Sequence, residues 1–87
     1  MNSHEKLVDL LAQHISLSKE EISAVLEVPP RSELGDYAFP CFALAKSRRQ
    51  APQKIAAELK EEIGSQADLS GFIERIEVAG AYLNFFI

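Results

Sequence analysis

Two β-prone runs on either side of Gly80-Ala81 constrain the fold of this 87-residue chain most strongly. The first run covers residues 72–78 and the second covers residues 82–87. A glycine at such a junction is typical of a tight turn, so we predict an antiparallel hairpin with its turn at Gly80. Side chains alternate along a strand, so the two faces of the second run should differ. One face should present Leu83, Phe85 and Ile87, and the other Tyr82, Asn84 and Phe86.

Helical spacing of apolar residues appears in the first half of the chain and again after residue 50. The spacing of Leu7, Leu11 and Ile15 predicts a helix over about residues 3–15. Residues 18–21 read Ser-Lys-Glu-Glu, a capping box that starts a short second helix. Pro52 suits a first helical turn and Gly64 a helix end, so we predict a helix between them.

The central part of the chain predicts a strand, a loop and a helix. Residues 24–29 are β-prone and end at a proline pair, and residues 29–36 are rich in turn formers. From residue 37 the spacing is helical, so a helix should begin near Ala38 or Phe39, with Pro40 in its first turn. Gly35 then supplies a turn, and Asp36 is the N-cap or N′ residue of this helix. The elements together predict one α+β domain over residues 1–87, a small mostly antiparallel sheet with helices packed against it.

Composition places the chain among ordinary globular proteins. It is 47% hydrophobic and 25% charged. A single cysteine, Cys41, excludes an intrachain disulfide and fits a reducing compartment. The N-terminus lacks the apolar core of a signal peptide, and no apolar run approaches the ~18 residues that span a bilayer. We expect a cytoplasmic protein with no membrane partner.

Catalytic and metal chemistry find no support in the sequence. His4 and His14 have no second ligand at useful spacing, and Cys41 has no partner cysteine. The glycines are isolated, so no phosphate-binding loop or dinucleotide fingerprint is present. We expect no catalytic residue, no metal and no cofactor in this chain.

Four cations lie within nine residues with no acid between them: Lys46, Arg48, Arg49 and Lys54. Such a cluster is commonly a solvated face, but it can also contact the phosphates of a nucleic acid. Arg31, in the predicted loop, is a further candidate for such a contact. The net charge of −4 argues against a free-standing nucleic-acid binder, yet it permits a local basic face.

Tyr82 and Asn84 are two residues apart in the predicted last strand, so both leave the same face. An aromatic ring beside a carboxamide suits the reading of an unstacked base. The alternative is a half-exposed strand face without a ligand.

Several segments, in order along nearly the whole chain, resemble one family. They are residues 27–29 (Glu-Val-Pro), 34–38 (Leu-Gly-Asp-Tyr-Ala), 43–46 (Ala-Leu-Ala-Lys), 51–56 (Ala-Pro-Gln-Lys-Ile-Ala), 76–80 (Ile-Glu-Val-Ala-Gly) and 83–85 (Leu-Asn-Phe). The chain thereby resembles the N-terminal domain of arginyl-tRNA synthetases. The resemblance implies an α+β domain that contacts the corner of tRNA(Arg) and helps recognise a base in its D-loop.

The resemblance also implies roles for particular residues and for a parent protein. An aromatic residue and an asparagine read the D-loop base in that family, and Tyr82 and Asn84 match their place and spacing. The family continues into a catalytic domain with an ATP-binding motif, whereas this chain stops at Ile87. ATP with magnesium, arginine and ligation are therefore implied for a parent protein only, and the catalytic domain of the same parent is an implied partner.

Three hypotheses follow from the sequence. The favoured one is a tRNA-binding module, with tRNA rather than DNA as its nucleic acid. The second is a protein-interaction adaptor, since an acidic α+β domain with exposed aromatic residues can dock another protein. The third, a small stand-alone enzyme, lacks any supporting site chemistry.

Overall fold

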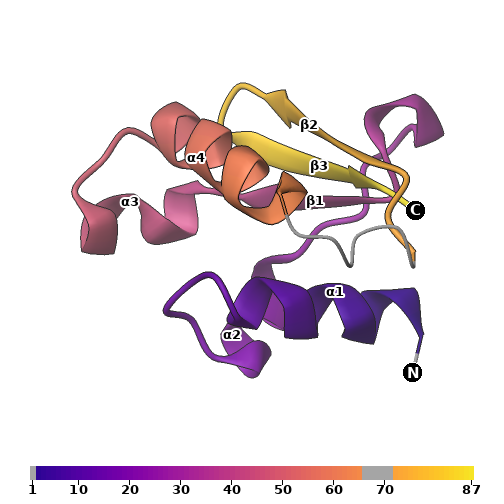
Figure 1. The fold of residues 1–87 in the computed structure, drawn as a ribbon, viewed down its shortest axis with the longest axis horizontal. Coiled ribbons are helices and arrows are strands. Elements are labelled where there is room, and N and C mark those ends of the chain that lie inside the picture. Colours follow the sequence, from indigo (N-terminus) through magenta and orange to yellow (C-terminus); the bar gives the residue numbers. More distant parts are fainter. Residues whose placement is uncertain (1, 66–71) are drawn as a thin grey trace.

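A three-stranded antiparallel sheet, with β3 in the middle, organises the computed structural model of the chain (Figure 1). The structure describes residues 2–65 and 72–87. The helices of this described part are α1 (Ser3–Ala12), α2 (Lys19–Val25), α3 (Phe42–Arg48) and α4 (Pro52–Gly64), with a 3₁₀ turn over Ser32–Leu34. The strands are β1 (Tyr37–Pro40), β2 (Arg75–Ala79) and β3 (Tyr82–Phe86), in the spatial order β1-β3-β2. The α+β class predicted from the sequence is confirmed.

The helix boundaries follow local capping chemistry. The Asn2 side chain accepts a hydrogen bond from the Glu5 amide at 2.9 Å at the start of α1. Both hydrogen bonds of the capping box between Ser18 and Glu21 are present, so the predicted start of α2 is confirmed. The predicted bounds of α4 are confirmed, whereas α1 ends at Ala12, three residues earlier than predicted. Among the described residues, no helix is both long and apolar enough to cross a membrane.

The C-terminal hairpin forms as predicted, in antiparallel pairing with its turn at Gly80, which has a φ of +61°. Glu77 pairs with Asn84 across the hairpin, and Val78 pairs with Leu83. Strand β1 pairs with the other edge of β3, where Ala38 lies opposite Asn84. Both neighbours of β3 therefore run antiparallel to it, and its register is fixed from both sides.

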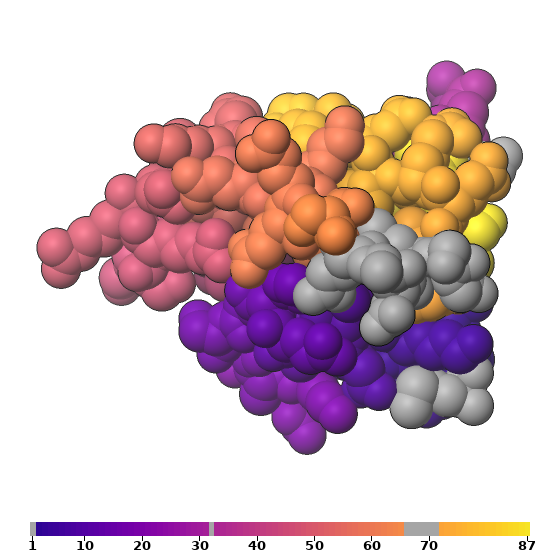
Figure 2. All heavy atoms as spheres, in the orientation of Figure 1, coloured from indigo at the N-terminus to yellow at the C-terminus, as the bar shows by residue number. Residues whose placement is uncertain are grey.

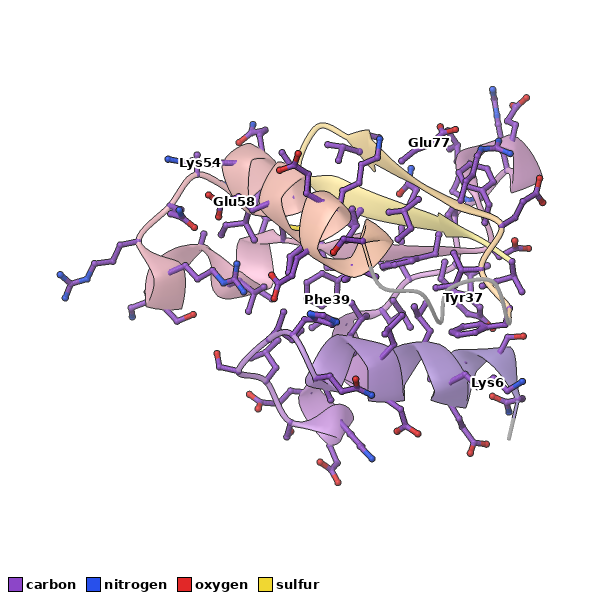
Figure 3. The ribbon with its side chains drawn as sticks, in the orientation of Figure 1. Lys6, Tyr37, Phe39, Lys54, Glu58 and Glu77 are labelled. Carbon is purple, nitrogen blue, oxygen red and sulfur yellow. The ribbon has the colours of Figure 1, made fainter. Side chains whose placement is uncertain are left out.

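The core lies between the inner face of the sheet and the helices. Leu83 and Phe85 of β3 are fully buried, as are Ile55 and Leu59 of α4, which packs on β2 and β3. Phe39 of β1 is also fully buried, and in the view of Figure 3 it lies between α4 and α1. Figure 2 shows α1 and α2 as one mass beside α3 and α4. Alternation along β3 thus directs one set of side chains into the core and the other set to the opposite face.

Two predicted elements were wrong. The strand predicted over about residues 24–29 is a single bridge, in which Glu27 exchanges two 2.8 Å backbone hydrogen bonds with Ala38. The helix predicted from Ala38 or Phe39 begins only at Phe42, because residues 37–40 form β1. Proline is tolerated at such a position because Pro40 is the last residue of its strand and needs no amide hydrogen there.

Cys41 lies at the N-cap of α3 and is fully buried. Burial raises the pKa of its thiol from the usual 9.0 to about 11, although the nearby positive charge of Arg48 acts in the opposite direction. The thiolate is the reactive form of cysteine, so a thiol with a raised pKa and no solvent access is a small apolar side chain in practice.

We expect the Cys41 thiol of the folded chain to resist alkylation by iodoacetamide at pH 8 and to react readily in denaturant. The pKa of the Cys41 thiol is higher in the folded chain than in the unfolded chain. The contribution of the protonated thiol to folding stability is therefore complete below pH 9 and is lost as the pH rises toward 11. Urea unfolding between pH 8 and pH 11 should therefore show a steeper loss of stability for the wild type than for Cys41→Ala. Parallel pH profiles for the two proteins would contradict this assignment.

Candidate functional site

A row of four residues crosses the outer face of the sheet, the face opposite α4. Glu27 bridges to Ala38, Ala38 lies opposite Asn84, and Asn84 lies opposite Glu77. Directly opposed residues of antiparallel strands project from the same face, so these four side chains form one line. Glu77, labelled in Figure 3, extends from β2. Asn84 therefore lies between Ala38 on one side and Glu77 on the other, and Glu27 lies on the far side of Ala38.

Tyr82 occupies the neighbouring row, between Pro40 and Ala79. Its hydroxyl donates a 3.4 Å hydrogen bond to Oε2 of Glu27. Its ring meets the ring of Phe42, the first residue of α3, edge to face, with the centroids 6.2 Å apart and an interplanar angle of 82°. The predicted pair, Tyr82 and Asn84, thus projects from one face of β3 as expected.

A cavity of about 190 Å³ lies over these rows. Its floor includes Ala38, Ala79 and Asn84, and the small side chains of the two alanines leave room above the sheet. Tyr82 and Glu27 line it as well, and Pro29, Pro30 and Leu34 of the loop complete it. The cavity is smaller than the roughly 300–1,000 Å³ of drug-sized ligand sites, so it suits one ring system rather than a whole nucleotide.

The loop over residues 29–36 is held against the end of β3 by its last two residues. Gly35 has a φ of +111°, and a Cβ atom there would lie 3.0 Å from the carbonyl oxygen of Phe85. The Asp36 amide donates to that same oxygen at 2.8 Å, and the Asp36 carboxylate accepts from the Ile87 amide at 2.7 Å. The predicted turn at Gly35 is confirmed, and its positive φ is one that favours glycine. The N-cap role predicted for Asp36 was wrong, because α3 starts after Cys41.

Asn84 is more enclosed than a half-exposed strand residue, with only 6% of its surface accessible. Within residues 2–65 and 72–87 its carboxamide has no hydrogen-bond partner, and the one fully buried polar side-chain atom without a partner there is Nε2 of His14. The carboxamide of Asn84 therefore faces the cavity with its donor and acceptor free. Because they are not among the fully buried unpartnered atoms, the nitrogen and oxygen of this carboxamide are accessible from the cavity and can hydrogen-bond to water or to a ligand there.

The predicted cations occupy different settings. Lys46, Arg49 and Lys54 are exposed, and the described part of the chain gives none of them an ion pair. Arg48 instead is partly buried and donates from its guanidinium to the carbonyl oxygen of His14 at 3.2 Å, which ties α3 to the end of α1. Arg31 is exposed beside the cavity loop and forms a 3.3 Å ion pair with Glu33. The four cations of residues 46–54 thus divide into one inward and three outward side chains.

Four residues of the site were missed in the sequence. Glu77 could have been found, because a hairpin that turns at residues 80–81 pairs residue 77 with residue 84. Phe42 was assigned only to a helical pattern, although it is 59% exposed. Glu27 and Ala38 reach the site through pairings between distant segments, for which the sequence carries no local signal.

Among residues 2–65 and 72–87, no group of three or more histidine, cysteine, aspartate or glutamate side chains could hold a metal ion. The residues that line the cavity offer hydrogen-bonding groups and an aromatic surface.

Comparisons with known proteins place this chain in one class, the N-terminal domains of aminoacyl-tRNA synthetases. Residues 4–87 match the family described as the arginyl tRNA synthetase N terminal domain. The chain is 48% identical over 87 residues to an arginine–tRNA ligase of Clostridium botulinum and 49% identical over 85 residues to one of Clostridium perfringens. The two alignments cover 100% and 97% of this chain but only 15% and 14% of those two relatives.

A solved structure of Thermus thermophilus arginyl-tRNA synthetase has the same fold, with a TM-score of 0.73 and 35% identity. The match covers 99% of this chain and 14% of that one. The chain belongs to the arginyl-tRNA synthetase N-terminal domain family, and it spans about 15% of the length of the relatives it matches.

Two glycines with positive φ give a matched test of how the cavity loop is attached. Gly35→Ala should destabilise the chain more than Gly80→Ala, because a Cβ at residue 80 meets no atom within 4 Å whereas one at residue 35 meets the backbone of β3. We expect about 1–2 kcal/mol for Gly80→Ala and at least about 1 kcal/mol more for Gly35→Ala. Thermal melts should separate the variants by several degrees, since 1 kcal/mol corresponds to about 4–8 °C in a domain of this size. Equal losses would show that the close approach of Gly35 to β3 is unimportant.

Proposed function

We propose that this chain is the tRNA-binding domain of an arginine–tRNA ligase, and that it contacts the corner of tRNA(Arg) and receives one D-loop base in the cavity beside β3. Family membership supports the parent enzyme. The observation that carries the base-binding site is the unpartnered carboxamide of Asn84 at the floor of a small cavity, next to the ring of Tyr82.

The chemistry of the cavity suits a single unstacked base. A carboxamide offers one acceptor and two donor hydrogens side by side, so Asn84 can pair with a base edge that presents a donor next to an acceptor. The ring of Tyr82 is partly exposed and gives the base an aromatic surface. Glu27 holds the Tyr82 hydroxyl and thereby orients the ring. Base recognition in RNA combines these two contacts, stacking and edge hydrogen bonds.

The outward cations are the proposed contacts to the tRNA backbone. Lys46, Arg49 and Lys54 can each approach a phosphate, and Arg31 can do so beside the cavity at the cost of its ion pair with Glu33. Arg48 is assigned a structural role, because its guanidinium is bonded to the His14 carbonyl. A local basic face of this kind is compatible with a net charge of −4, since no acidic residue occurs in the sequence between Asp36 and Glu58.

The remaining chemistry belongs to the parent enzyme in this proposal. ATP with magnesium, and arginine, are assigned to the catalytic domain of the same parent, because the relatives of this chain are arginine–tRNA ligases of which it matches only about 15%. The partners of the chain are tRNA(Arg) and that catalytic domain, and the parent acts in the cytoplasm.

Binding of tRNA(Arg) transcripts, each with one D-loop nucleotide replaced, tests the base-binding site. Asn84→Ala and Tyr82→Ala should each weaken binding by about 1–3 kcal/mol, roughly 5- to 150-fold. One D-loop replacement should weaken wild-type binding similarly but add little in the Asn84→Ala background, because the lost partner is the same. Folding should change by less than about 1 kcal/mol on Asn84→Ala, since no internal hydrogen bond to its carboxamide is lost.

Ala79→Leu is a second way to remove the same site. Ala79 is exposed and lines the cavity, so a larger side chain there fills the space from the open side without crowding the core. It should reduce tRNA binding as Asn84→Ala does. If all three variants lose affinity equally for every transcript, the residues act through the fold alone. If no variant binds tRNA differently from the wild type, or if the chain binds a protein partner and no tRNA, the adaptor hypothesis replaces this proposal.

Charge reversal tests the backbone contacts separately. Lys46→Glu and Arg49→Glu should weaken binding to all D-loop variants alike and lower the slope of log K against log salt by about 1 each. Lys60→Glu, on the exposed side of α4, is the matched control and should change the slope much less. If the slope is the same for all three variants, Lys46 and Arg49 make no specific phosphate contacts and belong to an ordinary solvated surface.

A further inference from the structure

Phe42 is a large aromatic side chain that the proposed base-binding site does not use. It is 59% exposed at the first position of α3, and its ring lies edge to face against Tyr82. Single exposed apolar residues are common on protein surfaces. This one, however, continues the aromatic surface of Tyr82 outward from the cavity, and much of its ring remains free for another contact.

The exposed side of α3 adds positive charge to this aromatic surface. Lys46 follows Phe42 by four residues and so lies on the same side of the helix. Arg49 ends the helix in the left-handed conformation, with a φ of +54°. Both cations are exposed, and within residues 2–65 and 72–87 neither has an ion pair. The connection from α3 to α4 projects from the body of the molecule, which leaves this region accessible (Figure 2).

The charges around the cavity have the opposite sign. Glu27 lines the cavity and Glu77 flanks Asn84 across the sheet. The Glu77 carboxylate is paired with Nε of Arg75 at 2.7 Å, so a phosphate over the cavity would meet chiefly the carboxylate of Glu27, whereas a phosphate along α3 would meet two cations without acidic partners in the described chain. A nucleotide whose base enters the cavity is therefore oriented with its backbone toward α3, and the next nucleotide of the strand lies over Phe42.

We propose that Phe42 is a second stacking surface, on which the nucleotide adjoining the cavity-bound one places its base while Lys46 and Arg49 contact the phosphates of that dinucleotide. This inference rests on the proposed tRNA function and extends the site from one nucleotide to two. Stacking on an aromatic face tolerates any base, so Phe42 contributes affinity whereas Asn84 contributes the choice of base.

The chain contains no tryptophan, so Phe42→Trp introduces a single fluorescent reporter at the proposed stacking position. Its emission should be quenched when tRNA(Arg) is added, and its affinity should match that of the wild type. Val28→Trp, at a residue that is 72% exposed and does not line the cavity, is the matched control and should show no such quenching. Phe42→Leu keeps an apolar side chain without a ring, and it should weaken binding about 5- to 150-fold for every D-loop variant.

The outcomes separate this inference from the one on which it rests. If Phe42→Leu binds as the wild type does, or Phe42→Trp is not quenched, while Asn84→Ala still weakens binding, the second stacking surface is refuted and the base-binding site stands. A loss on Phe42→Leu without quenching of Phe42→Trp would mean that Phe42 only positions Tyr82, which also overturns the proposal. If neither the wild type nor any variant binds tRNA, both proposals fall together.

Discussion

The attachment of one loop to the end of the central strand is the constraint on which the site depends. The Phe85 carbonyl accepts from the Asp36 amide, the Asp36 carboxylate accepts from the Ile87 amide, and Gly35 lies so near the same backbone that a Cβ atom would be 3.0 Å from the Phe85 oxygen. These contacts join residues about fifty positions apart. Without them the outer face of β3 would be an open sheet surface, and Asn84 would stand in bulk water rather than in a cavity.

The alternation of β3 separates stability from recognition. Its inward residues, Leu83 and Phe85, are fully buried in the core, whereas Tyr82 and Asn84 face the loop side. Phe86 also projects outward, but the guanidinium of Arg75 lies 3.8 Å from its ring centroid and covers it. A strand of five residues can thus bind a ligand with one face while the other face holds the helices in place, so changes at the outer face need not unfold the chain.

Local chemistry explains which parts of the structure the sequence could predict. The capping box at Ser18, the helix from Pro52 to Gly64 and the hairpin at Gly80 each depend on neighbouring residues, and each is confirmed. Strand β1 was predicted as a helix because its apolar residues continue the spacing of α3, and only its pairing with β3, over forty residues later, makes it extended. The enclosure of Asn84 likewise depends on a loop far away in the chain. Sequence patterns therefore placed Tyr82 and Asn84 on one face but could not show the cavity that both residues line.

The proposed contact between the Asn84 carboxamide and a D-loop base can be tested on that carboxamide itself. The chain has two asparagines, and Asn2 already caps α1 with its side-chain oxygen, so asparagine-selective ¹⁵N labelling gives one reporter and one internal control. On titration with tRNA(Arg), the side-chain NH₂ signals of Asn84 should shift while those of Asn2 stay in place. The shift should disappear for the one transcript whose D-loop base has been replaced. Unmoved Asn84 signals in the presence of bound tRNA(Arg) would contradict the account.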